Sequence, residues 1–314
     1  MEKQIRTVLG PTAPHEMGIT DAHNHIWISP PEELVEKVPV LNQEDLIKAE
    51  LDVFKELGGG GQIDCQPGFA GRDGNKLRAF STNSGVHIVS VTGFHLPIYY
   101  AENSPIWQMS TVQAYEFFIS EIKEGLIETR DCPNPVYPGL IKIAVQHNLD
   151  SSAQNLIEAA IQASQESGFS ITMHTEKGQN IEEFISLFDR FALVPEKVII
   201  CHIDKRPDFG LHRELAQEGY LLEYDTFFRP KYMPEETVWP LLTSMVHAGL
   251  SHSLALATDM AEGAMWAKIG GGPGISSLIQ IIKPKLVNMQ QDSKIISALI
   301  GGNISQRIAL QIME

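Results

Sequence analysis

Short apolar segments alternate with longer amphipathic segments along almost the whole chain. Eight segments have the length and composition of strands, at residues 19–23, 62–65, 86–93, 139–145, 170–174, 197–202, 220–224 and 254–258. Several of them are almost wholly apolar, which is typical of parallel strands that are covered on both faces. The pattern therefore predicts a buried parallel sheet.

The longer segments have the periodicity of amphipathic helices. In residues 44–57 the apolar positions Leu46, Ile47, Leu51 and Phe54 recur close to every 3.6 residues. Similar patterns occupy residues 111–128, 152–167, 181–191, 211–218 and 235–248. Alternating strands and helices without a long linker predict an α/β fold, a single (β/α)8 TIM barrel forming one domain over residues 1–314. A doubly wound open sheet is the alternative, but no dinucleotide-binding motif follows the first strand.

Charge and composition narrow the class of function. The chain has 24 Lys and Arg against 39 Asp and Glu, a net charge of −15, and no basic run, so we expect no nucleic-acid partner. No apolar stretch is long enough to span a membrane, and the N-terminus does not have the pattern of a signal peptide. The three cysteines, Cys65, Cys132 and Cys201, are widely spaced. We expect a cytoplasmic protein with a small-molecule substrate; the sequence leaves homodimerisation open.

Residue types that ligate metals stand at five of the predicted strand ends, where barrel enzymes place their catalytic groups. They are His23, His25, Lys142, His174, His202 and Asp259. Alternation along a strand puts His23 and His25 on one face, with Cα atoms about 6.6 Å apart. Each residue also has an ordinary reading, such as a lysine that reaches water or an aspartate that caps a helix. Their joint placement favours a metal site. Four imidazoles, the Asp259 carboxylate and a Lys142 side chain converted to an anion would suffice to bind two metals.

Two of these strand ends carry further expectations. Lys142 lies between apolar residues, where a charged ammonium is costly. It either reaches water or is carboxylated by CO2 to an anionic carbamate that bridges two cations. Cys201 directly precedes His202, so alternation predicts that its thiol points toward the helices.

The chain has two glycine clusters. Residues 58–61 predict a turn, and residues 270–274 predict either a turn or a loop that holds substrate.

The ordered set of motifs resembles the phosphotriesterase family of the amidohydrolase superfamily, in particular its phosphotriesterase-like lactonase branch. The resemblance covers nearly the whole chain. It rests on Val8-Leu9-Gly10, His23-Asn24-His25, Thr92-Gly93-Phe94, Ile141-Lys142, His174-Thr175, His202-Ile203-Asp204, Thr258-Asp259-Met260, Gly270 to Gly274, and Asn303. Family members usually have Glu where this chain has Asn24, and we expect that side chain to face away from the metals.

The resemblance implies a metal-dependent hydrolase with a carbamate on Lys142 and two divalent metals, with zinc foremost and manganese, cobalt or iron as alternatives. His23, His25 and Asp259 would hold the more buried metal, and His174 and His202 the more exposed one. Lys142 and a hydroxide would bridge the metals. The hydroxide would attack the substrate, and Asp259 would take its proton and pass it to the leaving group.

Departures from the family bear on the substrate. His95 stands where many of these lactonases have Tyr, and it is either a donor to the substrate carbonyl or simply a loop residue. Asp225 is followed by Thr226, where relatives commonly have a basic residue.

The segment Arg229-Pro230-Lys231-Tyr232 resembles a stretch in relatives that hydrolyse phosphorylated sugar lactones, which makes Arg229, Lys231 and Tyr232 candidate substrate-binding residues. Those relatives also carry arginines soon after the Asp-Met of the eighth strand, where this chain has Ala261-Glu262-Gly263, and Glu262 would repel a phosphate. The alternative is that Arg229 and Lys231 are a solvated charge pair.

We therefore expect a lactonase that opens a small sugar-derived lactone, with or without a phosphate. A phosphotriesterase or an amide hydrolase built on the same site is the alternative. A non-catalytic metal-binding barrel is disfavoured because Lys142 and Asp259 are both present.

Overall fold

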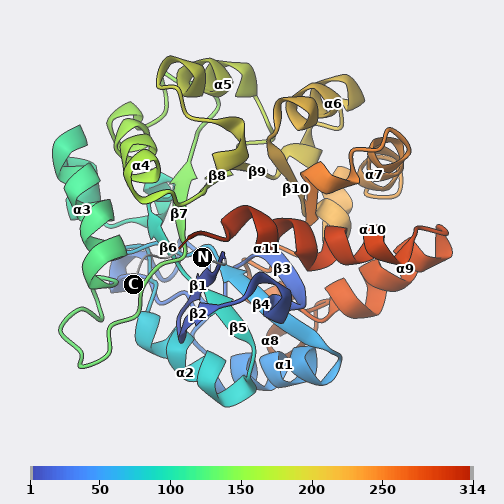
Figure 1. The fold of residues 1–314 in the computed structure, drawn as a ribbon. Helices are drawn as coiled ribbons and strands as arrows, with labels where there is room; N and C mark the ends of the chain where they lie inside the picture. The colour runs from blue at the N-terminus through green and yellow to red at the C-terminus, as the bar shows by residue number, and fades with distance from the viewer. Residues whose placement is uncertain (1–2, 312–314) are drawn as a thin grey trace.

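Parallel strands form a barrel that is surrounded by helices (Figure 1). We describe residues 3–311 of a computed structural model. The barrel strands are β3 (Ile19–Asn24), β4 (Gly59–Asp64), β5 (His87–Val89), β6 (Val91–Gly93), β7 (Leu140–Ala144), β8 (Ile171–His174), β9 (Val198–Cys201), β10 (Leu221–Tyr224) and β11 (Leu254–Leu256).

Two parallel sheets, β3-β4-β5 and β6 to β11, make up the barrel wall. They are joined at Ser90, because β5 and β6 are consecutive parts of one extended segment. At the other seam the backbone N–H of Asp259 donates to the carbonyl oxygen of His23 at 3.1 Å. This arrangement confirms the predicted (β/α)8 barrel.

The helices pack outside the strands, most of them in the outer layer of the barrel and one across its end. They are α1 (Glu44–Glu56), α2 (Gly74–Ser84), α3 (Thr111–Glu124), α4 (Gln154–Ser167), α5 (Ile181–Arg190), α6 (Phe209–Glu218), α7 (Val238–His247), α8 (Ala267–Gly270), α9 (Lys283–Asn288), α10 (Ser293–Ser297) and α11 (Asn303–Ile308). The hairpin of β1 (Ile5–Thr7) and β2 (Gly10–Thr12) lies with α11 across one end of the barrel (Figure 1). In residues 3–311 no helix is long and apolar enough to cross a membrane.

The predicted strands all appear within three residues of their expected bounds, but some local predictions were wrong. The helix expected to reach residue 128 ends at Glu124, because Gly125 has a φ of 104°. The glycine cluster expected to form a turn lies mostly inside β4. A Cβ on Gly60 would lie 2.0 Å from the carbonyl oxygen of Met17. Glycine is therefore needed there because β4 packs closely against the backbone of Met17, at the end of the short helix Pro14–Met17.

The interior of the barrel is a separate apolar layer that includes Ile63, Val91, Leu140, Ile199 and Leu221. Cys201 belongs to this layer, so the prediction that its thiol points toward the helices was wrong. The alternation rule fails because the strand ends at Cys201 and His202 takes a left-handed conformation, with a φ of 62°. Both side chains are thereby directed into the barrel.

A buried ion cluster fixes the loop after β4. The Arg72 guanidinium pairs with Glu121 of α3 at 2.5 Å and with Glu128 at 2.7 Å, and it donates to the carbonyl oxygen of Val91 at 2.6 Å. The side chains of Arg72 and Glu121 are fully buried. The cluster thus ties the loop that follows β4 to both α3 and β6.

Candidate metal centre

Four histidines at the barrel mouth each have one ring nitrogen held by an oxygen acceptor. The pairs are His23 Nδ1 with Glu223 Oε2 at 3.2 Å, His25 Nδ1 with Gln66 at 2.7 Å, His174 Nε2 with Glu176 at 3.1 Å, and His202 Nδ1 with Asp225. A metal-binding histidine is commonly held in this way through the nitrogen that does not ligate. The second nitrogen of each ring is then left for a ligand.

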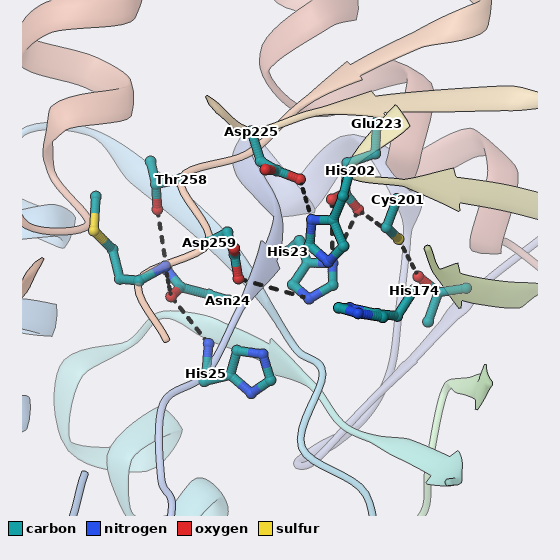
Figure 2. A network of polar contacts seen from close by, with 12 residues as sticks. His23, Asn24, His25, His174, Cys201, His202, Glu223, Asp225, Thr258 and Asp259 are labelled. Carbon is teal, nitrogen blue, oxygen red and sulfur yellow. Dashed lines mark hydrogen bonds and ion pairs between the residues drawn. The ribbon is translucent and has the colours of Figure 1, made fainter. Parts of the chain in front are cut away.

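The rings converge on one another (Figure 2). Ring centroids lie 4.8 Å apart for His23 and His202 and 4.6 Å apart for His174 and His202. The Lys142 Nζ atom lies 3.4 Å from His23 Nε2, and a carboxylate oxygen of Asp259 lies 4.0 Å from the same nitrogen. The structure thus brings the predicted metal-binding residues into one cluster at the ends of β3, β7, β8 and β9, together with Asp259 after β11.

The electrostatics of the cluster favour neutral imidazoles. Burial lowers the pKa of His23, His174 and His202 below the ordinary value, and it lowers the pKa of His25 to about 4. Burial alone would raise the pKa of Asp259, but the neighbouring His202 and Arg229 outweigh it and leave that pKa lowered. Neutral imidazole and ionised carboxylate are the forms that bind divalent metals. The donor set therefore fits a metal centre.

Two of these ligand candidates occupy unusual backbone conformations. His202 and Asp259 both have positive φ values, 62° and 46°, which cost about 1–3 kcal/mol for residues other than glycine. His202 directly follows β9 and Asp259 lies three residues after the end of β11, and the left-handed conformation directs each side chain into the mouth of the barrel. Such strain is concentrated at functional sites.

Asn24 faces away from the cluster, as expected, but it also builds the frame of the site. Its amide nitrogen donates to Gln62 at 3.0 Å and to Thr258 at 3.3 Å, and its oxygen accepts from the backbone N–H of His25 and of Met260 (Figure 2). Asn24 therefore links β3 to the segment that carries Asp259.

A cavity of about 160 Å³ opens beside the histidines. Its cationic and aromatic lining includes Lys205, Arg229, Lys231 and Tyr232. The ammonium groups of Lys205 and Lys231 lie 5.8 Å and 5.2 Å from the centre of the Tyr232 ring. Exposed Glu262 lines the same cavity. The candidate substrate-binding residues Arg229, Lys231 and Tyr232 thus all line the cavity. Lys205 is a further cation there, which the sequence motifs did not predict.

Arg229 is engaged within the site. Its Nη2 group donates to the carboxylate of Asp259 at 2.7 Å and to the carbonyl oxygen of Asp259 at 2.6 Å. Thr226 instead donates to Asp204 at 2.7 Å. Arg229 is thus the basic residue that contacts Asp259, and Thr226 contacts Asp204.

His95 is buried at the cavity wall, with its ring centroid 5.0 Å from that of His174 and 4.3 Å from that of Tyr99. Its backbone N–H donates to the hydroxyl of Tyr100 at 2.8 Å, and its Nδ1 accepts from the backbone N–H of Leu96 at 2.7 Å. Burial lowers its pKa well below the ordinary value. The Nδ1 contact leaves Nε2 as the nitrogen that carries the proton.

The glycine-rich segment at residues 270–274 does not line this cavity. The buried Glu50 carboxylate accepts from the backbone N–H groups of Ala267, Lys268 and Ile275 around it. The sequence allowed either a turn or a substrate-binding loop here. The structure favours a turn that is stabilised by hydrogen bonds to Glu50.

Sequence reasoning did not single out Glu223, Gln66 and Glu176, which hold the histidines. Glu223 carried a usable signal, because it is a carboxylate inside an otherwise apolar strand. Gln66 and Glu176 lie in loops, and loop side chains carry no periodicity from which their direction could be predicted.

Comparisons with known proteins agree with this geometry. The model of the phosphotriesterase family matches residues 3–306. A phospho-furanose lactonase of Mycoplasmopsis synoviae is 28% identical over 271 residues, which span 82% of this chain and 76% of the relative. The human N-acetyltaurine hydrolase is 25% identical over 327 residues, 90% of this chain and 91% of the relative.

A solved lactonase structure from Listeria monocytogenes superposes with a TM-score of 0.89 at 22% identity, covering 97% of this chain and 98% of that one. At this identity the likeness supports the barrel fold alone. The match of the family model over almost the whole chain shows that the chain belongs to the phosphotriesterase family.

Proposed function

We propose that the chain is a metal-dependent lactonase whose substrate is a small sugar-derived lactone bearing an anionic group such as phosphate. The observation that carries the proposal is the position of the cationic residues. Lys205, Lys231 and Tyr232 line the same cavity as the cluster of histidines. A substrate that fills this cavity can have its carbonyl at the cluster and its anion at the lysines.

The residues that would hold two divalent metals are His23, His25, Lys142, His174, His202 and Asp259. Metals bound there would supply Lewis-acid polarisation of the lactone carbonyl and a lowered pKa for a water molecule, so that the water could act as a nucleophile near neutral pH. A carbamate on Lys142 would supply an anionic ligand, and the full burial of this side chain supports that modification over a free ammonium.

The chain's own groups have separate tasks in this proposal. Asp259 accepts the proton of the attacking water and returns it to the alkoxide that leaves when the ring opens. His95 donates from Nε2 to the substrate carbonyl. Lys205 and Lys231 bind the anionic group. Burial would lower the pKa of Lys205, but the carboxylates of Asp225 and Asp259 outweigh it and keep that amine charged.

Relatives named phospho-furanose lactonase support a phosphorylated furanose lactone as the substrate class. An amide hydrolase is a second candidate, favoured by relatives named N-acetyltaurine hydrolase that cover more than 90% of the chain. Taurine amides carry a sulfonate, which the same two lysines would bind. Both candidates therefore place an anion at one end of the substrate.

The test combines metal analysis with a matched substrate panel. Protein purified without chelator is analysed for metals and assayed on a furanose lactone 5-phosphate, the same lactone without phosphate, N-acetyltaurine and a neutral phosphotriester. We expect two metals per chain and a kcat/KM for the phosphorylated lactone about 10- to 150-fold above that of its neutral counterpart, as one charged hydrogen bond provides. Two metals without turnover of either lactone would refute the lactonase. Equal rates on the two lactones would refute the anion site.

A further inference from the structure

Glu223 is a carboxylate in the interior of the barrel. It belongs to β10 (Leu221–Tyr224), is 0% exposed, and lies beside His202 and Cys201 (Figure 2). Leaving a carboxylate in such a place without a partner costs several kcal/mol. Among residues 3–311 no lysine or arginine nitrogen lies within 4.0 Å of it. Its partners must therefore be hydrogen-bonding groups of the cluster itself.

Those partners are a metal-ligand candidate and a thiol. Both oxygens of Glu223 lie close to His23 Nδ1, at 3.1 Å and 3.2 Å. The Cys201 thiol donates to Glu223 Oε2 at 3.1 Å, and Thr172 Oγ1 lies 2.9 Å from the same sulfur. These contacts form a buried chain from Thr172 through Cys201 and Glu223 to His23.

We infer that Glu223 is a positioning residue that holds His23 for the more buried metal. The carboxylate keeps the His23 proton on Nδ1, which leaves Nε2 facing Lys142 and Asp259 at 3.4 Å and 4.0 Å. A carboxylate partner also makes an imidazole a stronger ligand than a neutral partner does. This inference rests on the proposed metal centre and assigns a role to a residue outside its ligand set.

Glu223 differs in charge or burial from the supports of His25 and His174. Asp225, which holds His202, is also a fully buried carboxylate, but His202 is proposed for the more exposed metal. His25, the second histidine proposed for the more buried metal, is held by the neutral amide of Gln66. His174 is held by Glu176, whose side chain is 32% exposed and therefore partly screened by water. Glu223 is the fully buried carboxyl group behind His23, so its replacement is expected to weaken the more buried metal selectively.

The experiment compares Glu223→Gln with a matched control. Glutamine keeps the shape and an acceptor oxygen but removes the charge. Glu50→Gln makes the same change at another buried glutamate, 2% exposed, which accepts from backbone N–H groups and touches none of the metal-ligand candidates. Zinc dissociation constants are measured by chelator competition, and the visible spectrum of the Co²⁺ form reports ligand geometry.

We expect Glu223→Gln to weaken one of the two zinc sites about 10- to 100-fold and to change the Co²⁺ spectrum, with Glu50→Gln unchanged in both. Zinc constants within twofold of the wild type at both sites would overturn the inference. If Glu223→Gln does not fold, the test uses Cys201→Ala, which removes the donor to Glu223. This variant should weaken zinc binding at the same site several-fold. An unchanged zinc dissociation constant would overturn the inference. Wild-type protein that binds two zinc ions but opens no lactone would refute only the proposed function.

Discussion

Replacing Arg229 with methionine removes the guanidinium that donates to the carboxylate and the carbonyl oxygen of Asp259. Methionine fills a similar volume, so the change tests the charge and hydrogen bonds more than the packing. Arg229 has two conceivable tasks, namely to hold Asp259 or to bind the anionic group of the substrate. The hydrogen bonds to Asp259 favour the first task.

The expected magnitude follows from the burial of the pair. The side chains of Arg229 and Asp259 are 13% and 8% exposed, so water screens their interaction only partly. Hydrogen bonds to charged groups contribute about 1.5–3 kcal/mol, and 1.36 kcal/mol corresponds to about a tenfold change in rate. If Asp259 needs the Arg229 guanidinium to be correctly positioned in the transition state, kcat should fall about 10- to 150-fold.

The assay measures kcat and KM on a phosphorylated furanose lactone and on the same lactone without phosphate. Arg229→Met should lower kcat on both substrates by a similar factor. Lys231→Met is the matched control, because Lys231 lines the cavity without contacting Asp259. It should raise KM for the phosphorylated lactone alone.

A loss confined to the phosphorylated lactone in Arg229→Met would refute this reasoning. Arg229 would then be a substrate clamp, and its bond to Asp259 would belong only to the protein without substrate. Retention of full kcat on both lactones would contradict either task. The pair of variants therefore separates the positioning of Asp259 from recognition of the anion.

Three further changes test the fold and the electrostatics. Arg72→Met, which removes the ion-pair partner of the fully buried Glu121 and of the partly buried Glu128, should lower the free energy of unfolding by about 3–5 kcal/mol in urea titrations. The metal-free protein should lose about 2 kcal/mol from His25 alone between pH 7 and pH 5. The folded pKa of His25 is about 4 against an ordinary 6.5, so the unfolded chain takes up more protons as the pH falls; a flat stability curve would contradict this. Gly93→Ala places a Cβ 1.9 Å from the carbonyl oxygen of Lys142, at a φ of 109°. It should cost roughly 3 kcal/mol in thermal unfolding and reduce metal content.

The barrel was predictable because its strands are short, apolar and regularly spaced. Parallel strands buried on both faces leave a signal that survives without any knowledge of tertiary contacts. Helix α2 was missed, although Asp73 caps its N-terminus by accepting from the backbone N–H groups of Asn75 and Lys76. Its apolar face is narrow, so periodicity alone did not reveal it. The glycines of β4 were misread because the need for glycine arises from contact with Met17, which is remote in sequence.

The gathering of the six metal-ligand candidates was predictable from strand ends, but the direction of individual side chains was not. Alternation along a strand assumes extended backbone, and it fails at His202 and Asp259, where φ is positive. The same failure explains why Cys201 and His202 both face the barrel interior. The supports in the loops, Gln66 and Glu176, depend on loop conformations that no local pattern encodes.

The charge of the whole chain and the charge of the cavity act in opposite directions. A net charge of −15 repels an anionic substrate at long range, so recognition of such a substrate must come from cations placed within the cavity. Arg229 is largely neutralised by Asp259, whereas Lys205 and Lys231 face the Tyr232 ring from nearby positions and have no ion-pair partner within 4.0 Å in the described chain. The two lysines are therefore the groups whose charge is available to an anion. Under the proposed function we therefore expect Lys205 and Lys231 to recognise the anion, and Arg229 to hold Asp259.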